Sequence, residues 1–368
     1  MRLGRCLVAL MVGCGASSAA LAQSSVETGA GPMQITQMAA GLVEPWGIAF
    51  LPDGSFLITE RDGRLKHFAT PGAEPVLISG LPEVYAEGQG GLLDILIPRD
   101  FAQSREVWLT FAQPQGDGAG TAVGRGTLSV DGTVLEAFTT VFAAPPGGTG
   151  GRHFGARLVE ARDGTIFVTL GERGTGPDGM EAQDPLRAEG KVIHLNRDGS
   201  PATRLVGALP GVYSLGHRNP QGAAVDLAGN LLIAEHGAQG GDELNLVSEG
   251  KNYGWPVISY GVNYDGAKIG EGQAKPGMEQ PLMYWDPSIA PSGLLVYSGA
   301  LVPDWTGDIF VGSLKFDYVA RLDPDAGYAE EQIAARETGR VRDVVEAPDG
   351  SIWFLSVLNE AAYRLAPQ

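Results

Sequence analysis

The segment 216–256 concentrates the residue types that bind charged ligands. It contains the runs Gly-His-Arg-Asn-Pro-Gln-Gly at 216–222, Glu-His-Gly at 235–237, Gly-Asp-Glu-Leu-Asn at 241–245 and Asn-Tyr-Gly-Trp-Pro at 252–256. Packing of a hydrophobic core seldom calls for so many Gly, amide, acid and Arg residues in one span. The composition therefore indicates loops that hold a charged ligand and a hard cation.

A His and a Glu upstream of this segment form a second group of candidates. His153 stands in the Gly-rich run 150–155, just before a predicted strand, and is one of five His residues. Its side chain is suited to accept a proton near neutral pH. Glu172 ends the following strand, where its carboxylate can orient and polarise the imidazole. Taken alone, each is more often structural: His153 as a hydrogen-bonded loop residue, and Glu172 as a solvated or salt-bridged acid.

Basic residues supply candidate anion ligands. Arg218 offers a planar fork that matches carboxylates, and Asn219 can donate to a carbonyl or quinone oxygen. Lys315 follows a predicted strand, and Arg340 and Arg342 are expected to alternate on one face of another strand. Individually, such residues are most often surface charges paired with acids. Together they predict one cationic pocket, suited to a multiply charged anion, in an otherwise acidic protein.

The candidates for a cation site are fewer and less specific. Glu243 and Tyr253 qualify because calcium prefers carboxylate and carbonyl oxygens. Gly237 and Ala238 can present main-chain carbonyls from a tight loop. The spacing does not match an EF-hand, so it does not identify a metal by itself. Gln89 lies in a Gly-rich turn and can contact a ligand, although a plain turn is an equal interpretation.

Composition and the N-terminus limit the classes of function. The chain has 368 residues and a formal net charge of −17, which disfavours nucleic acid and anionic membranes as partners. Residues 1–22 are typical of a signal peptide, with a basic start, an apolar run and an Ala-Leu-Ala cleavage site. We therefore expect a periplasmic or secreted protein without a membrane span. An uncleaved anchor and a lipoprotein cleaved before Cys14 are less favoured alternatives.

Both cysteines of the chain, Cys6 and Cys14, lie in this leader. The mature protein would then contain no thiol. That excludes disulfides, thiolate zinc sites and cysteine nucleophiles. A chain of this size can bury a core large enough to fold without disulfides.

A turn followed by a short apolar β run recurs along residues 23–368. Clear copies occupy 52–59, 162–169, 228–234, 306–312 and 348–354, and 104–110 is a degenerate copy. The copies lie roughly 40–80 residues apart, the spacing of propeller blades with loop insertions. The repeats predict an all-β, six-bladed propeller in one domain. A β-sandwich is less favoured, because its turns should recur every ~8–12 residues. The candidate residues fall in the loops between repeats.

Several motifs, in order along the chain, resemble the soluble PQQ-dependent sugar dehydrogenases, and among these the aldose sugar dehydrogenase branch. The similarity runs through nearly the whole mature chain, from Pro-Trp-Gly-Ile-Ala-Phe at 45–50 to Arg-Asp-Val at 342–344. Its most specific pieces are 216–222, 241–245 with 252–256, and Pro-Ser-Ile-Ala-Pro-Ser-Gly at 287–293. Members of that family are six-bladed propellers that bind pyrroloquinoline quinone (PQQ) and calcium.

The resemblance implies a specific reaction and a specific site. An aldose would be oxidised at C1 to the lactone, with electrons passing from PQQ to an external acceptor, in a monomer or homodimer. His153 would be the general base with Glu172 as its partner, and Arg218 would polarise the quinone. The positions that match cofactor contacts are Gln89, Arg218, Asn219, Tyr264, Lys315, Arg340 and Arg342. Those that match calcium ligands are Gly237 and Ala238 for the cofactor-bound ion, and Glu243 and Tyr253 for a second, structural ion.

Three positions depart from the family's glucose enzyme. Ala238 stands in place of Pro, which a main-chain ligand tolerates, and Glu172 stands in place of Asp. Asp286 replaces an aromatic residue that contacts sugar, so the substrate identity does not carry over. Two rival functions are a calcium-dependent propeller lactonase and a non-catalytic sugar-binding propeller. The first does not need the cationic group, and the second does not need His153.

Overall fold

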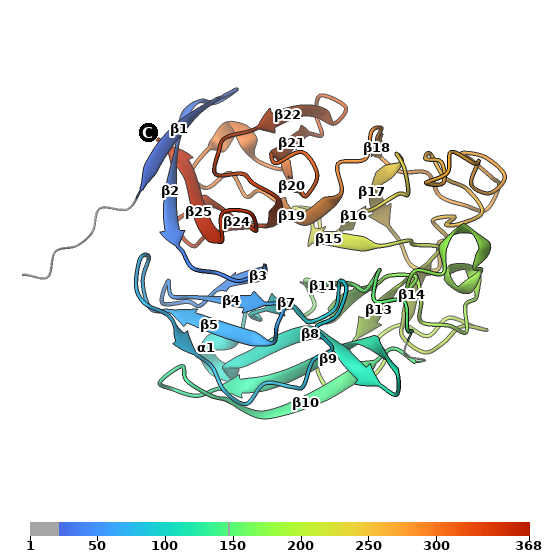
Figure 1. Ribbon diagram of the computed structural model, residues 1–368, viewed down its shortest axis with the longest axis horizontal. Coiled ribbons are helices and arrows are strands. Elements are labelled where there is room, and N and C mark those ends of the chain that lie inside the picture. The colour runs from blue at the N-terminus through green and yellow to red at the C-terminus, as the bar shows by residue number, and fades with distance from the viewer. Residues whose placement is uncertain (1–21, 146–147) are drawn as a thin grey trace, which may run out of the picture.

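Six β-sheets arranged around one axis make up the protein (Figure 1). The computed structural model describes residues 22–145 and 148–368. Five sheets have four strands and one has five, and neighbouring strands within every sheet are antiparallel. The prediction of an all-β, six-bladed propeller is therefore confirmed. The leader expected at 1–22 lies outside the described residues, apart from Ala22.

Blades 1 to 3 each have four strands, which follow in chain order from the axis outward. Blade 1 contains β3 (Pro45–Phe50), β4 (Phe56–Glu60), β5 (Arg64–Phe68) and β6 (Val76–Leu77). Blade 2 contains β7 (Leu92–Leu96), β8 (Glu106–Gln115), β9 (Gly118–Leu128) and β10 (Leu135–Ala143). Blade 3 contains β11 (Gly155–Glu160), β12 (Ile166–Leu170), β13 (Lys191–Leu195) and β14 (Val212–Leu215).

Blades 4 and 5 have the same order, and blade 6 gains two outer strands from near the N-terminus. Blade 4 contains β15 (Pro220–Val225), β16 (Leu231–Glu235), β17 (Asp242–Val247) and β18 (Met283–Trp285). Blade 5 contains β19 (Pro291–Val296), β20 (Ile309–Ser313), β21 (Val319–Asp323) and β22 (Ala329–Ile333). Blade 6 contains β23 (Val341–Glu346), β24 (Ile352–Ser356), β25 (Ala361–Pro367), β2 (Gly31–Ala39) and β1 (Gln23–Thr28).

Helical structure in the described residues is limited to four short pieces. They are α1 (Phe101–Ser104), η1 (Gly176–Asp178), η2 (Glu181–Gln183) and η3 (Pro303–Trp305). None of them is long and apolar enough to cross a membrane. The fold therefore rests on sheet pairing and on packing between sheets.

The recurring turn of the sequence joins the first and second strands of a blade. In blade 1 the Asp53 carboxylate accepts hydrogen bonds from the peptide N–H and the hydroxyl of Ser55, at 3.0 and 2.6 Å. Gly54 between them has φ +85°, a conformation that glycine adopts without a steric penalty. Blades 3 and 6 repeat this turn at Asp163 and Asp349. The turn chemistry in the sequence thus sets the start of each second strand.

Pairing between the two ends of the chain closes the ring. Strand β2, near the N-terminus, is hydrogen-bonded to β25, near the C-terminus, so blade 6 is built from both ends (Figure 1). The innermost strands contact one another in the cyclic order β3, β7, β11, β15, β19, β23 and back to β3. Closure of this kind leaves no open edge along the axis.

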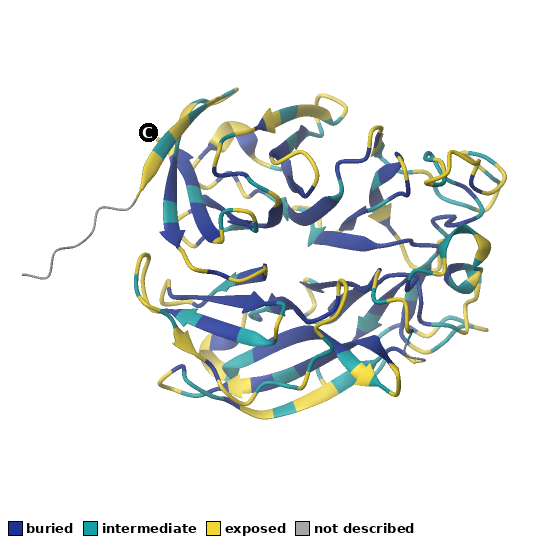
Figure 2. Cartoon of the chain, viewed as in Figure 1, coloured by how far each residue is buried: buried dark blue, intermediate teal, exposed yellow. Residues whose placement is uncertain are grey.

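The hydrophobic core lies between blades. Each of the six largest clusters of buried apolar residues joins two neighbouring blades, as Trp305 of blade 5 joins Phe354 of blade 6. The outer strands β1 and β10 are mostly exposed or half-buried, and burial increases toward the axis (Figure 2). A blade therefore depends on both neighbours to bury its two faces.

One face of the ring collects the loops that carry the candidate residues. Each innermost strand begins where the second strand of its blade ends, because the two are antiparallel. All six innermost strands also have a register shift near their first residues. Such bulges re-aim side chains and are common beside active sites. The loops that enter the innermost strands and those that leave the second strands therefore open on the same face.

Buried threonines connect blades 1 to 4 close to this face. Thr59, Thr110 and Thr169, on three successive second strands, each accept a hydrogen bond from a peptide N–H of their own innermost strand. Each hydroxyl donates to a carbonyl of the next innermost strand, at 2.5, 2.7 and 2.8 Å respectively. The hydroxyls therefore fix the spacing of neighbouring blades.

We predict that Thr110→Val destabilises the protein by about 1–3 kcal/mol, because it leaves the buried N–H of Asp94 and carbonyl of Ala156 without a partner. Urea unfolding followed by circular dichroism measures this change. Thr127→Val is the matched control, since Thr127 is exposed on β9 of the same blade. Equal stability of the two variants would contradict the role given to the Thr110 hydroxyl.

Candidate functional site

His153 and Glu172 meet on the loop face of blade 3. His153 precedes β11 and has φ +56°, a left-handed conformation that is uncommon outside glycine. Its peptide N–H donates to Gln89 Oε1 at 2.9 Å, and its ring Nδ1 contacts Glu172 Oε1 closely. Gln89, expected as a ligand contact, therefore also fixes the main chain of His153. The backbone strain persists because contacts on both sides hold the residue.

The Glu172 carboxylate determines which ring nitrogen of His153 is basic. Burial by itself raises the pKa of Glu172, but hydrogen bonds from His153, Thr175 and Gly176 outweigh it and leave that pKa at about 2. An ionised carboxylate only accepts, so Nδ1 carries the proton and Nε2 holds the free lone pair. Burial, assisted by the nearby Arg218 cation, lowers the pKa of His153 below its usual value. The imidazole is therefore neutral and available as a base at neutral pH.

The Arg218–Asn219 pair is buried, and its backbone is held on both sides. The peptide N–H of Arg218 donates to Glu235 Oε2 at 2.8 Å, and its carbonyl accepts from the Glu172 N–H at 2.8 Å. Asn219 Oδ1 accepts from the Gly155 N–H at 3.1 Å. Within the described residues, Arg218 Nε and Asn219 Nδ2 are buried without a hydrogen-bond partner. Buried donors without a partner need an explanation, and a ligand that offers acceptor oxygens would satisfy them.

Four basic side chains on this face have no carboxylate partner. Among the described residues, none of Arg218, Lys315, Arg340 and Arg342 forms an ion pair. Burial, with repulsion from Arg340, Arg157 and Arg61, lowers the pKa of Arg342 to about 9. In a chain with 43 acidic and 26 basic residues, cations without partners on one face indicate a site for an external anion.

One expectation about this group is wrong. Strand β23 begins at Val341, so Arg340 precedes the strand, where it has φ +49°. A register shift between Val341 and Asp343 also breaks the simple alternation of side chains. Arg340 is exposed and donates to the carbonyl of Leu314, whereas Arg342 is buried. Arg340 therefore lies at the surface of the site, and Arg342 lies in its interior.

Two loops of blade 4 provide oxygen atoms suited to a cation. The N–H of Gly237 donates to Asp242 Oδ1 at 2.7 Å, and no hydrogen bond from the described residues reaches the carbonyls of Gly237 or Ala238. A cavity of about 10 Å³, enough for one water-sized species, is lined by Gly237, Glu235 and Glu243 among others. Burial and the neighbouring Glu235 raise the pKa of Glu243 to about 8.

This donor set fits calcium better than a metal that prefers nitrogen or sulfur ligands. No group of three or more His, Cys, Asp or Glu side chains that could hold a metal occurs in the part of the chain that the structure describes. The Tyr253 hydroxyl donates to the Leu246 carbonyl and accepts from the Ser248 N–H. Tyr253 can therefore offer a cation only its main-chain carbonyl. Tyr264 is exposed, and its hydroxyl lies 3.3 Å from Arg218 Nη2.

Sequence reasoning missed the residues that support these loops. Asp242 accepts from the Gly237 and Ala290 N–H groups and from the Ser288 hydroxyl, at 2.7–2.9 Å, so it joins two loops of the site. Lys191 is fully buried and donates to three carbonyls of 181–189. Trp285 beside Asp286 is buried and donates to Glu330. Buried charge follows from tertiary contacts, and the sequence carries no local signal for it.

Known proteins resemble this chain over nearly its whole length. A sequence model of the family Glucose / Sorbosone dehydrogenase matches residues 42–364. The Escherichia coli (strain K12) aldose sugar dehydrogenase YliI is 42% identical over 327 residues, 86% of this chain and 87% of that protein. A crystal structure of a glucose dehydrogenase has 40% identity and a TM-score of 0.84, covering 91% of this chain and 99% of that one. The PQQ-bound aldose sugar dehydrogenase of Streptomyces coelicolor has 25% identity and a TM-score of 0.77, covering 93% and 99%.

We predict that Glu172→Gln lowers the pKa of His153 further, because the carboxylate favours the imidazolium and an amide does not. In the wild type this pKa should lie below the usual histidine value. NMR titration of the histidine Cε1–H signals measures the pKa of His153 in the wild type and in Glu172→Gln. His194, which contacts Thr165 and Thr203 instead, is the internal control and should titrate alike in both proteins. An unchanged His153 titration in Glu172→Gln would contradict the pairing.

Proposed function

The chain belongs to the Glucose / Sorbosone dehydrogenase family, and on that premise we propose that it is a PQQ- and calcium-dependent aldose sugar dehydrogenase. It would oxidise aldoses at C1 to the lactone and pass the electrons to an external acceptor. The observation that carries this proposal is the group of four unpaired cations beside the His153–Glu172 pair. An anionic cofactor needs the cations, and removal of a proton from a sugar hydroxyl needs the His153–Glu172 pair.

The residues present fit both bound groups. PQQ carries three carboxylates, for which Lys315, Arg340 and Arg342 supply charge, and its quinone oxygens suit the free donors of Arg218 and Asn219. The open carbonyls of Gly237 and Ala238 suit a calcium ion at the cofactor. Glu243 and the Tyr253 carbonyl suit a second ion, which would lower the repulsion between Glu243 and Glu235.

The chain's own residues would handle the proton and the orientation. His153 Nε2 accepts the proton of the C1 hydroxyl, and Glu172 stabilises the imidazolium that forms. The Arg218 guanidinium, which donates to the His236 carbonyl and lies over the Trp255 ring, would polarise the acceptor oxygen. When bound, PQQ supplies the hydride acceptor and calcium supplies Lewis acidity. The lactone carbonyl forms as C1 loses the proton from its oxygen and the hydride from its carbon.

The two rival functions would need fewer of the residues on this face. A calcium-dependent lactonase has no need for a tricarboxylate site, and a sugar-binding propeller has no need for a buried base with a carboxylate partner. A PQQ-bound structure within the similar proteins further supports the dehydrogenase. We propose export to the periplasm or beyond on the strength of the leader at 1–22.

Reconstitution tests this function directly. We expect purified protein, stripped with EDTA, to reduce an artificial dye with aldoses only after both PQQ and calcium are added. Addition of EDTA to the reconstituted protein should remove the activity. A panel of hexoses, pentoses and disaccharides defines the substrate range. Absence of PQQ-dependent dye reduction with every sugar would eliminate the proposed reaction.

We further predict that His153→Ala lowers kcat by ~10²–10⁴-fold, the usual contribution of a general base, and leaves PQQ affinity within about threefold. Steady-state kinetics and fluorescence titration with PQQ measure the two quantities. His194→Ala is the matched control, because His194 is half-buried on β13 and contacts only threonine hydroxyls through its ring nitrogens. Normal turnover by His153→Ala would remove this residue from catalysis.

A further inference from the structure

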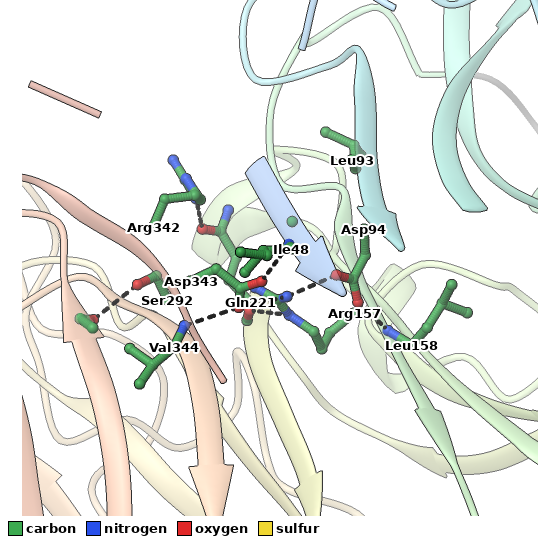
Figure 3. Close-up of polar contacts among 12 residues, drawn as sticks. Ile48, Leu93, Asp94, Arg157, Leu158, Gln221, Ser292, Arg342, Asp343 and Val344 are labelled. Atoms are coloured by element: carbon green, nitrogen blue, oxygen red, sulfur yellow. Dashed lines mark hydrogen bonds and ion pairs between the residues drawn. The ribbon is translucent and has the colours of Figure 1, made fainter. Parts of the chain in front are cut away.

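A cluster of buried charged and polar residues lies where the innermost strands of four blades meet (Figure 3). We call Asp94, Arg157, Gln221, Arg342 and Asp343 the axial cluster. Its members come from the innermost strands of blades 2, 3, 4 and 6, and none is more than 9% exposed. The mechanism proposed above uses only Arg342. The other four residues are buried charged or polar groups that need an explanation.

Arg157 is the centre of this cluster. Its Nη1 donates to Asp94 Oδ1 at 2.7 Å and to Asp343 Oδ1 at 2.9 Å. Its Nε donates to the Gln221 carbonyl at 3.0 Å. One guanidinium therefore serves two carboxylates and the main chain of a third strand. The geometry of these contacts fixes Arg157 across the axis.

The two acids also take part in the backbone of the ring. Asp94 Oδ2 accepts from the Leu158 N–H at 2.7 Å, and Asp343 Oδ2 accepts from the Ile48 N–H at 3.0 Å. Glycines make room for them, since a Cβ on Gly293 would approach Asp343 Oδ1 to 2.2 Å. These contacts hold the carboxylates of Asp94 and Asp343 in place next to Arg157.

Arg342 has a different set of contacts from its neighbour Asp343. Its Nη1 donates to Gln221 Oε1 at 2.7 Å, the only hydrogen bond that its side chain makes to the described residues. Gln221 thus accepts from Arg342 with its side chain and from Arg157 with its main chain (Figure 3). The Trp46 ring lies 4.5 Å from Arg157 Cζ and 5.7 Å from Arg342 Cζ. Gln221 and Trp46 therefore orient the guanidinium groups of both Arg157 and Arg342.

We propose that Arg157 is a positioning residue of the cofactor site: by binding Asp94 and Asp343, it keeps both acids from pairing with Arg342 and leaves that guanidinium free for a carboxylate of the ligand. This inference rests on the proposed function, since the ligand carboxylate belongs to PQQ. Arg157 itself need not touch the cofactor.

Arg157 is the only cation that forms an ion pair with Asp94 or Asp343 in the described residues. Burial already raises the pKa of both carboxyls, that of Asp94 to about 7, so each depends on this partner to stay ionised. Without Arg157, the two carboxyls would be buried and unpaired, and each would be neutralised by a proton or would pair with another cation. Arg342 is adjacent in the chain to Asp343 and forms no ion pair with any other residue that the structure describes. It is therefore the cation that the acids would attract, at the expense of the external anion.

A purely structural role for Arg157 makes a different prediction. If Arg157 only connects blade 3 to blades 2, 4 and 6, its loss weakens the fold, and neutralising the acids does not restore ligand affinity. If it keeps the acids from Arg342, neutral Asn residues at 94 and 343 restore affinity even though Arg157 is missing. The two roles are therefore separated by a rescue variant.

The experiment compares Arg157→Met with the triple variant Arg157→Met/Asp94→Asn/Asp343→Asn. Arg321→Met is the matched control, because Arg321 also contacts two acids and a Trp ring but lies on β21, outside the cluster. Affinity is measured for PQQ with calcium, and separately for citrate, a tricarboxylate without redox chemistry. Thermal unfolding of each apo-protein and kcat at saturating PQQ complete the set.

We expect Arg157→Met to weaken PQQ and citrate binding at least tenfold with kcat within about twofold of wild type. The triple variant should return to within about threefold of wild-type affinity, and Arg321→Met should bind normally. The proposal would be overturned if the triple variant still bound PQQ and citrate at least tenfold more weakly than the wild type. Because the triple variant removes the two buried carboxylates together with their cation, it decides the question even where Arg157→Met does not fold.

A crystal structure of apo Arg157→Met, or of Arg157→Gln where Met is not tolerated, separates this inference from the proposed function. Arg342 turned onto Asp343 would support the inference whether or not the wild type binds PQQ. Arg342 still on Gln221, with both acids in place, would overturn it. A wild type that binds citrate but not PQQ would refute the proposed function alone.

Discussion

Closure of six innermost strands around one axis is the constraint on which the rest of this structure depends. Pairing of β2 with β25 completes the ring and brings side chains from every blade into one narrow space. In such a space a charge is close to charges on several other strands. Each axial group therefore needs a partner from another blade. Asp343 meets this need through Arg157 and the Ile48 N–H, from blades 3 and 1.

The same constraint explains how an acidic protein keeps a cationic site. Its 43 acidic residues have many opportunities to neutralise 26 basic ones. Asp343, which is adjacent to Arg342 in the chain, is already bound by Arg157 together with Asp94. The Arg342 side chain donates instead to Gln221, which is neutral. Lys315 and Arg340 lie on exposed loops, where they contact Phe316 and the Leu314 carbonyl rather than a carboxylate. Anion affinity thus depends on where the protein places its own acids.

The fold and much of the site could be predicted from the sequence, because they have local signals. The Asp-Gly turns mark the second strands, and a His among glycines marks His153. The contacts that organise the site are not local: Arg157 meets Asp94 and Asp343 over separations of 63 and 186 residues. The alternation expected for Arg340 and Arg342 failed because a bulge changes which side chains face the axis. A bulge reflects tertiary crowding, for which the sequence of one strand gives no signal.

Glu172 is held in place by the short turn that follows it in the chain. Glu172 Oε2 accepts from the Thr175 hydroxyl at 2.6 Å and the Gly176 N–H at 2.9 Å, while Oε1 accepts from the Gly174 N–H at 3.1 Å. The loop 174–176 therefore fixes the carboxylate that His153 contacts. The glycines of this loop have φ of +79° and +72°, which lets their N–H groups converge on one carboxylate. The orientation of the base thus depends on a turn that holds its acid in place.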